Sequence, residues 1–348
     1  MTVADLTERE LIARIQQRLT PSPAWMTVGI GDDAAVVETE RNKLDVFTVD
    51  ASVEGIHFKR EWSPPAAIGH RALAVNLSDL AAMGASPRLA LLSLVLPPDL
   101  PVDDFDGLID GFTALAASER VTVAGGNLTR SPGPLMVDVT AIGTVKRRQV
   151  MTRTGARPGD EIYVTGSIGA AAAGLQFLQH SPLGSEWCLT PNTKYPGSDT
   201  TLTPDIAECV EIYRRPTART RAGLLAGRAR AVSACMDLSD GLADAVRQVT
   251  EASGVGATLD AAQLPIHAGA REWFTSRGED PAIAALSGGD DYELLFTVHP
   301  RRRRTFLGAL RQAGTPVTKV GVCTPEKVLQ LRGADAAAAF PQGFGHFR

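Results

Sequence analysis

Hydrophobic and polar positions along this chain alternate between two periods. Strand-like patterns, either alternating or continuously apolar, occur in four segments of the first half: 43–50, 88–97, 121–126 and 135–145. Between them, residues 65–85 and 102–120 carry apolar side chains at helical spacing, and the first of these segments starts at a proline and stops at Gly84 and Pro87. The first half therefore predicts a sheet with helices packed against it.

A second domain is expected to begin near Val150. Residues 153–169 combine the turn sequence Arg-Pro-Gly-Asp with a new strand and a glycine-punctuated helix start. We therefore predict domains at 1–149 and 150–348. The periodicity is lost over 180–205, which predicts an exposed loop insertion. The remaining pattern predicts helices at 219–230, 243–254 and 302–313 and strands leading into 236–242 and at 292–298 and 317–322.

Composition narrows the class of protein. The 348 residues are 44% hydrophobic and 21% charged, which suits two globular domains, and the net charge of −4 argues against a nucleic-acid partner. The basic run Arg301–Arg304 is short and fits a solvated helix start. Four cysteines without a C-x-x-C pair predict neither a zinc site nor a disulfide framework. With no membrane-length apolar stretch and an acidic, amphipathic N-terminal helix pattern, we expect a cytoplasmic protein without a membrane partner.

Aspartates recur at strand ends and in glycine turns. Each alone is readily explained as a helix cap or turn residue. Two negative charges about 4 Å apart repel by about 4 kcal/mol at an effective dielectric of about 20, so several of them together need protons or cations. Hard oxygen ligands without competing nitrogen or sulfur favour magnesium. The aspartates concerned are Asp32, Asp33, Asp50, Asp79, Asp237, Asp240, Asp290 and Asp291.

Phosphate-binding loops of the usual kinds are absent from the sequence. There is no G-x-x-x-x-G-K-[ST], and "GIGDD" lacks the third glycine of a dinucleotide fingerprint. Residues 124–130, 165–174 and 286–294 are glycine-rich and offer backbone N–H groups to phosphate, although each also fits an ordinary turn. No Ser-His-Asp or Cys-His set is evident, so nucleophilic hydrolysis is not supported.

The order of eight motifs resembles the thiamine-monophosphate kinase family. These are "GIGDDAAVV", "TVDASVEGIHF", "ALAVNLSDLAAMGASP", "AGGNLTR", "RTGARPGDEIYVTG", "MDLSDGL", "ALSGGDDYELLFTV" and "GFGHF". The resemblance spans nearly the whole chain except 180–205. It implies the two-domain α/β fold with mixed sheets of the PurM-like superfamily, in which the N-terminal domain binds ATP and metal and pairs across a homodimer.

The resemblance also implies an activity and a set of site residues. The activity is transfer of the ATP γ-phosphoryl group to thiamine monophosphate, assisted by several Mg²⁺ ions, with Asp50, Asp79 and Arg153 at the reaction centre. The matched metal-binding positions are Asp33, Thr48, Val49, Asp50, Asp79, Asn127, Asp237 and Asp240, with Asp32 as an additional candidate. Gly126, Asn127, Arg153 and Ser239 match ATP contacts, and His57, Asp290 and Phe344 match contacts with thiamine phosphate.

Elementary chemistry agrees with this activity. A phosphate monoester already presents an anionic oxygen, so the obstacle is repulsion between two polyanions, which magnesium ions and Arg153 would neutralise. His57 and Phe344 offer faces to a cationic thiazolium ring. Apart from the resemblance, His57 equally fits a strand-end histidine with satisfied hydrogen bonds, and Phe344 equally fits a tail packing residue.

Three departures from the family pattern leave alternatives open. Asn127 stands where the family usually has aspartate, Asp290 stands where some members carry glutamate, and 180–205 is an insertion. One alternative is another ATP-dependent enzyme of the superfamily with a different acceptor; its selenophosphate branch is disfavoured because the N-terminal region has no reactive cysteine. The other is a slow or inactive homologue that binds nucleotide and thiamine phosphate, motivated by the charge lost at Asn127.

Overall fold

The computed structural model describes residues 1–180, 203–333 and 340–343. These residues form two compact units. The N-terminal unit comprises 1–80 and 86–147, and the C-terminal unit comprises 81–85 and the described residues from 148 onward. Both units combine helices with β-sheets, which confirms the predicted α/β class with mixed sheets.

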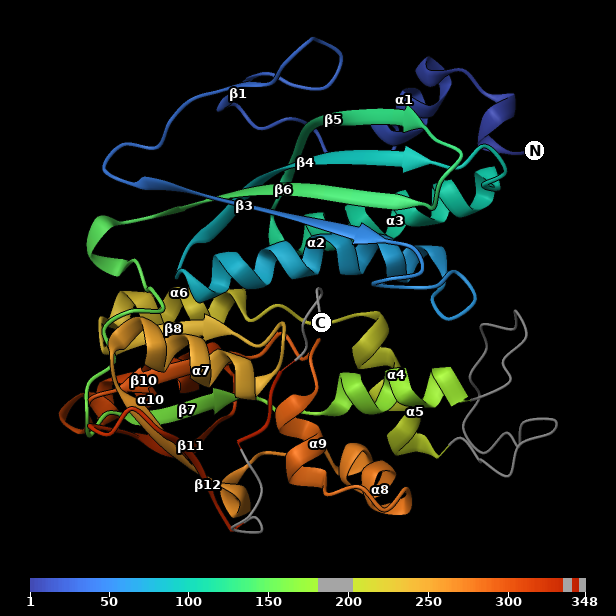
Figure 1. Cartoon of the computed structure of the whole chain (residues 1–348). Coiled ribbons are helices and arrows are strands. Elements are labelled where there is room, and N and C mark those ends of the chain that lie inside the picture. Colours follow the sequence, from blue (N-terminus) through green and yellow to red (C-terminus); the bar gives the residue numbers. More distant parts are fainter. Residues whose placement is uncertain (181–202, 334–339, 344–348) are drawn as a thin grey trace. The chain divides into compact units, whose positions relative to one another are not determined.

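A four-stranded sheet forms the centre of the N-terminal unit, with strand order β3-β6-β4-β5. Its strands are β3 (Leu44–Val53), β6 (Met136–Val145), β4 (Ser86–Leu96) and β5 (Thr122–Arg130), and only the β4–β5 pair is parallel. Helices α2 (Pro65–Ala82) and α3 (Val102–Glu119) cover one face of this sheet (Figure 1). The core between sheet and helices contains the buried side chains of Leu73, Leu77, Leu92, Leu94, Phe105, Phe112, Val137 and Val139.

Smaller elements precede this sheet. They are η1 (Val3–Asp5), α1 (Glu8–Gln16), β1 (Met26–Val28) and β2 (Val36–Val37), and a further short helix, η2 (Arg147–Gln149), begins at the end of the unit. Thr7 and Glu10 form a capping box at the start of α1, in which the Thr7 N–H donates to Glu10 at 2.7 Å. The predicted amphipathic N-terminal helix is confirmed, and Leu11 and Ile15 are its buried residues.

The strand predicted at 121–126 continues beyond its glycines. In β5, a Cβ atom on Gly126 would lie 1.8 Å from the carbonyl oxygen of Leu92 on the neighbouring strand β4. Glycine is therefore required here by the close approach of two strands rather than by a turn. The predicted strand ended too early, at its glycine pair, because a turn and a crowded strand both select glycine.

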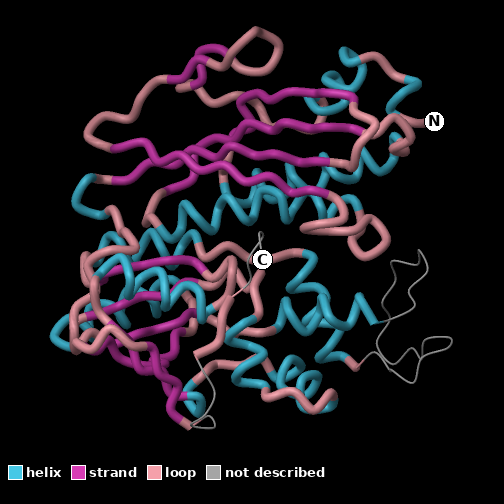
Figure 2. The backbone as a smooth tube through the Cα atoms, viewed as in Figure 1, coloured by secondary structure: helices cyan, strands magenta, loops and turns pink. Residues whose placement is uncertain are grey.

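The C-terminal unit contains a second sheet, drawn in magenta in Figure 2. It has six strands in the order β12-β9-β11-β7-β10-β8. The strands are β7 (Glu161–Thr165), β8 (Val232–Asp237), β9 (Gly256–Asp260), β10 (Leu294–Val298), β11 (Val317–Thr324) and β12 (Leu329–Arg332). Only β12 and β9 run parallel. Short 3₁₀ segments η3 (Ala261–Gln263) and η4 (Pro300–Arg302) join these elements.

Both faces of this sheet are covered, because alternate residues of β7, β8 and β10 enter different cores. Met236 packs in one core with α7 (Leu242–Ser253), whereas its neighbour Cys235 packs in the other. The second core contains α6 (Thr220–Ala229) and α10 (Arg303–Ala313). The predicted helices at 219–230, 243–254 and 302–313 are confirmed and supply these cores.

Helices α4 (Ala170–His180), α5 (Pro204–Arg214), α8 (Ala268–Ser276) and α9 (Pro281–Ser287) pack together beside this sheet. The sequence pattern predicted the start of α4 but not α8 or α9, and it missed strands β9 and β12. The predicted loop at 180–205 lies, except at its two ends, outside the described residues. Among the described residues, no helix combines the length and apolar character needed to cross a membrane.

Candidate active site

Two aspartates of the N-terminal unit lie between β3 and α2. Alternate residues of β3 face this helix, and the Thr48 hydroxyl donates a hydrogen bond to Oδ2 of Asp79 on α2. Asp50 lies two residues further along β3 and therefore faces the same side. Burial, the charge of Asp79 and the charge of Asp138 together raise the pKa of Asp50 to about 7.

Asp138 is a carboxylate that sequence reasoning missed. It lies on β6 in register with Ala51 of β3, so its side chain is on the sheet face opposite to that of Asp50, and its charge acts on Asp50 from there. Its Oδ1 atom is buried and has no hydrogen-bond partner. The available signal was a single aspartate inside the apolar strand pattern of 135–145, but its proximity to Asp50 depends on the pairing register of β3 and β6.

Other predicted residues of the N-terminal unit lie elsewhere. His57 follows β3, and its Nδ1 accepts a hydrogen bond from the Val53 N–H at 3.1 Å, as a strand-end histidine would. Asp32 and Asp33 are exposed, and the Asp33 N–H donates to Oδ1 of Asp32 at 2.9 Å. The turn between these carboxylates and Ile30 includes Gly31 at φ +119°, which explains the glycine.

Gly126 and Asn127 lie on β5, at the opposite edge of the sheet from Thr48, Val49 and Asp50 on β3. Strands β6 and β4 intervene, so three strand spacings of about 4.8 Å place the two edges about 14 Å apart. The exposed Asn127 donates through Nδ2 to Thr129 Oγ1 at 2.9 Å. One copy of the chain therefore does not bring Asn127 to Asp50.

In the C-terminal unit, the structure brings four predicted residues together at the ends of two neighbouring strands. Asp237 ends β8, Ser239 and Asp240 follow it, and Asp290 precedes β10, the antiparallel neighbour of β8. The Asp290 N–H donates to the Ser239 carbonyl at 2.7 Å. Asp237 is buried, whereas the other three are half-buried. The loops at 237–241 and 288–293 thus form one structural unit.

Arg153 is exposed and lies over α7. Its Nη1 donates to Gln248 Oε1 at 2.7 Å, and Gln248 Nε2 donates to Asp244 Oδ2 at 2.5 Å. This chain of polar contacts holds a cationic side chain beside the helix that starts just after Asp240. Phe344 lies outside the described residues.

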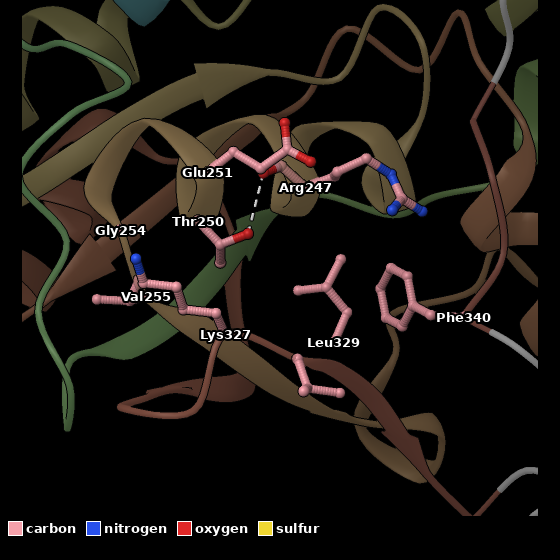
Figure 3. A pocket seen from close by; sticks show the side chains of 9 residues that line it. Arg247, Thr250, Glu251, Gly254, Val255, Lys327, Leu329 and Phe340 are labelled. Carbon is pink, nitrogen blue, oxygen red and sulfur yellow. Dashed lines mark hydrogen bonds between the residues drawn. The ribbon is translucent and has the colours of Figure 1, made fainter.

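A cavity of about 590 Å³ in the C-terminal unit is lined by none of the predicted site residues (Figure 3). Arg247, Thr250 and Glu251 of α7 line one side, and Leu329 and Phe340 line another. The three α7 residues belong to the C-terminal part of that helix, whereas Asp240 precedes its N-terminus. A helix of this length spans about 18 Å, so the cavity is separate from the aspartate-bearing loops.

The donor set suits a hard cation. Asp50 and Asp79 offer carboxylate oxygens on the side of β3 that faces α2, and the charge of Asp79 helps to raise the pKa of Asp50. Within the described residues, no group of three or more His, Cys, Asp or Glu side chains is close enough to enclose a metal ion. These carboxylates therefore fit Mg²⁺ that takes its other ligands from water and phosphate, rather than an all-protein cage.

Comparison with known proteins identifies the family. Residues 31–145 match the family model described as AIR synthase related protein, N-terminal domain, and residues 157–333 match the corresponding C-terminal domain model. The thiamine-monophosphate kinase of Bacillus subtilis is 32% identical over 99% of this chain and 100% of its own length. The chain belongs to the thiamine-monophosphate kinase family. The resemblance read from its motifs is thereby confirmed.

Solved structures of thiamine-monophosphate kinases share the fold over 94–100% of this chain. The enzyme from Stenotrophomonas maltophilia is 38% identical, with a TM-score of 0.79 over 94% of this chain and 97% of its own. The structure of AaThiL complexed with AMPPCP and TMP is 30% identical, with a TM-score of 0.74 over 100% of this chain and 99% of its own. These likenesses confirm the PurM-like fold predicted for this family member.

Proposed function

We propose that this chain transfers the γ-phosphoryl group of ATP to thiamine monophosphate, producing thiamine diphosphate and ADP. The observation that carries the proposal is its full-length similarity to thiamine-monophosphate kinases, including a structure in complex with AMPPCP and TMP. The electrostatics of the N-terminal unit support it. Carboxylates that repel one another beside a half-buried strand suit a reaction whose barrier is repulsion between polyanions.

Each unit offers its own carboxylates to Mg²⁺. Asp50 and Asp79, with Thr48 beside them, are the proposed ligands in the N-terminal unit, and Asp237 and Asp240 are those of the C-terminal unit. Asp33, Val49 through its backbone and Asn127 complete the proposed set. When bound, the ions neutralise phosphate charge and favour in-line attack. The negative charge of Asp138, which raises the pKa of Asp50, also favours uptake of a cation near Asp50.

Other residues would bind the two substrates. Arg153 would contact the ATP phosphates, and its bond to Gln248 limits the orientations of its guanidinium group. Gly126 and Ser239 are the further proposed ATP contacts. Asp290, His57 and Phe344 are proposed to contact thiamine monophosphate, with the ring faces of His57 and Phe344 toward the thiazolium cation. Because the acceptor phosphate is already anionic, no general base is required of these residues.

A homodimer would complete the site. Phe47 and Val49 point from β3 to the sheet face that does not face α2, and they are 67% and 61% exposed. Asp50 and Asn127 lie on opposite edge strands of one sheet. A second copy that set its β5 beside β3 would cover both edges and supply Asn127 to the first copy's Asp50.

Product formation tests the proposed activity directly. Purified protein is incubated with ATP, Mg²⁺ and either thiamine monophosphate or thiamine, and thiamine diphosphate and ADP are quantified by chromatography. Thiamine diphosphate formed with equimolar ADP from the monophosphate, and lost in Asp50→Asn, supports the kinase. ADP release that occurs only with another phosphate acceptor would instead support a different ATP-dependent enzyme of the superfamily.

A specific observation keeps the binding homologue as second candidate. Asn127 carries no charge where the family pattern has aspartate. The same assay on Asn127→Asp distinguishes the two functions. Turnover that appears only in Asn127→Asp, while the wild type binds nucleotide and thiamine monophosphate without releasing ADP, supports the binding homologue.

Mixed dimers test the shared site. The Asp50→Asn and Asn127→Ala variants are purified separately, and each is expected to be inactive by itself. The two proteins are then dissociated, mixed in equal amounts and allowed to reassociate. If each site combines Asp50 of one copy with Asn127 of the other, the mixed dimer has one intact site, and random pairing restores about one quarter of wild-type activity. If both residues act within one copy, no mixed dimer has an intact site and activity stays at the level of the parent variants.

A further inference from the structure

Asp291 is a buried aspartate next to Asp290 that the proposed site does not use. Its side chain is 6% exposed, and its two carboxylate oxygens accept the Gly169 N–H at 3.1 and 2.9 Å. Gly169 immediately precedes α4, so the carboxylate lies at the N-terminus of that helix. Burial raises the pKa of Asp291 well above its usual value, against the lowering effect of the Gly169 and Ala171 N–H groups.

The backbone on both sides of Asp291 is strained. Asp290 has φ +68° and Tyr292 has φ +50°, and both are non-glycine residues in the left-handed region. Such conformations persist only where the surrounding structure holds them. Strain of this kind next to a proposed substrate contact requires an anchor, because the loop would otherwise relax to ordinary backbone angles.

Hydrogen bonds of the loop show what holds it. The Asp290 N–H donates to the Ser239 carbonyl at 2.7 Å, and the Tyr292 N–H donates to the Leu238 carbonyl at 3.1 Å. The Tyr292 hydroxyl donates to Asp290 Oδ1 at 3.1 Å. The two backbone bonds join the loop to residues 238–239, the Tyr292 hydroxyl bond lies within the loop, and the Asp291 carboxylate joins the loop to the N-terminus of α4.

We propose that Asp291 is a positioning residue for the phosphate acceptor, fixing Asp290 in its left-handed conformation by joining the loop to the N-terminus of α4. The inference rests on the proposed function, in which Asp290 contacts thiamine monophosphate. Asp291 itself is buried and acts only through Asp290. Its loss therefore weakens acceptor binding and leaves nucleotide binding intact.

The test compares Asp291→Asn with a matched control, Asp260→Asn. Asp260 also accepts a backbone N–H, that of Ala262 at 3.0 Å, but at the short helix η3. For Asp291→Asn, the KM for thiamine monophosphate rises about tenfold, whereas kcat at saturation and the KM for ATP change less than about twofold. Asp260→Asn leaves all three values unchanged. An unchanged acceptor KM in folded Asp291→Asn overturns the inference.

A double-mutant cycle with Asp290→Ala separates positioning from general destabilisation. If Asp291 acts through Asp290, Asp291→Asn raises the acceptor KM by less than about twofold in the Asp290→Ala background. An equal tenfold rise in both backgrounds overturns the inference. Failure of the wild type to phosphorylate thiamine monophosphate would reject the proposed function instead.

Thermal melting decides whether the variants are folded. If Asp291→Asn does not fold, Asp291→Ser replaces it, because the shorter serine side chain also removes the two-oxygen contact with the Gly169 N–H. The same rise in acceptor KM is expected. If neither variant folds, Asp291 is only a structural residue and the inference is overturned.

Discussion

Two groups of acidic residues in this molecule have opposite electrostatic surroundings. Glu161 on β7 is 4% exposed, and it accepts hydrogen bonds from Arg303, from Lys319 Nζ at 2.8 Å and from the Tyr163 hydroxyl at 2.9 Å. Burial raises its pKa, but these bonds outweigh burial and lower the pKa to about 2. For Asp50, burial and then the negative charges of Asp79 and Asp138 raise the pKa to about 7, and no basic side chain is among these causes.

The difference separates a structural acid from a binding one. The protein itself neutralises Glu161, so this charge contributes to folding and leaves nothing for a ligand. Around Asp50, the fold retains repulsion that a bound cation would relieve. Acidic residues that a protein leaves unneutralised at a half-buried site indicate function more strongly than the number of acidic residues does.

Asp50→Asn gives the largest expected effect. It removes a proposed metal ligand while keeping the size of the side chain, and we expect turnover to fall by about 10²- to 10³-fold. Because it also removes repulsion with Asp79 and Asp138, the Tm without metal stays equal or rises. Steady-state kinetics and thermal melting on the same preparation measure both. A large drop in Tm would mean that Asp50 is structural, like Glu161.

The pH dependence of Asp50 follows from the sign of its shift. Its pKa rises from 3.8 to about 7 on folding, so the unfolded chain ionises first and stability without metal falls as pH increases between these values. Cations bind the ionised form, and Mg²⁺ affinity therefore falls about tenfold for each pH unit below 7. Calorimetric titration from pH 5.5 to 8 measures this slope. An affinity independent of pH in this range would contradict the assignment.

Glu161→Gln gives the converse result. We expect the Tm at pH 7 to fall by about 3–5 °C, with turnover per folded molecule unchanged. Since folding lowers the Glu161 pKa from 4.5 to about 2, this stabilisation is complete above pH 4.5 and disappears as pH falls toward 2. The gap in Tm between wild type and variant therefore narrows in melts at pH 3. A gap that stays constant would show that packing, not charge, stabilises the site.

Asn127→Asp is expected to give the smallest effect of these variants, a change in Mg²⁺ affinity. Adding a carboxylate on β5 should tighten Mg²⁺ binding in the presence of nucleotide by about three- to tenfold, because one neutral amide oxygen becomes a charged ligand. The Tm changes little, since Asn127 is exposed. Calorimetric titration of Mg²⁺ into the wild type, Asn127→Asp and the control Asn127→Ser measures this affinity. Equal affinity in all three proteins would place Asn127 away from the metal.

Much of the architecture was predictable because long periodic segments determine their own structure. The helices found as α2, α3, α7 and α10 and the strands found as β3, β4 and β6 follow directly from the apolar pattern. The short helix α9 and strand β12 were not predicted, because seven and four residues carry too little periodicity. The predicted end of β5 was wrong, because Gly126 allows a close approach of two strands and does not mark a turn.

The candidate site was less predictable because it depends on pairing between distant segments. The motifs suggested Asp50, Asp79, Asp237, Ser239, Asp240 and Asp290 from sequence alone. Asp138 comes close enough to raise the pKa of Asp50 only through the register of β3 with β6, which no local pattern encodes. The separation of Asn127 from Asp50 likewise follows from the strand order.

The number of metal ions bound by the wild type, Asp50→Asn and Glu161→Gln tests most directly the claim that Asp50 holds a cation and Glu161 does not. Mn²⁺ serves as a paramagnetic substitute for Mg²⁺, and electron paramagnetic resonance counts bound ions at pH 7.5 with a non-hydrolysable ATP analogue present. We predict that the wild type and Glu161→Gln bind the same number of ions with equal affinity, whereas Asp50→Asn loses at least one ion. Equal binding by all three proteins would contradict the account, because the Asp50 carboxylate would then hold no cation.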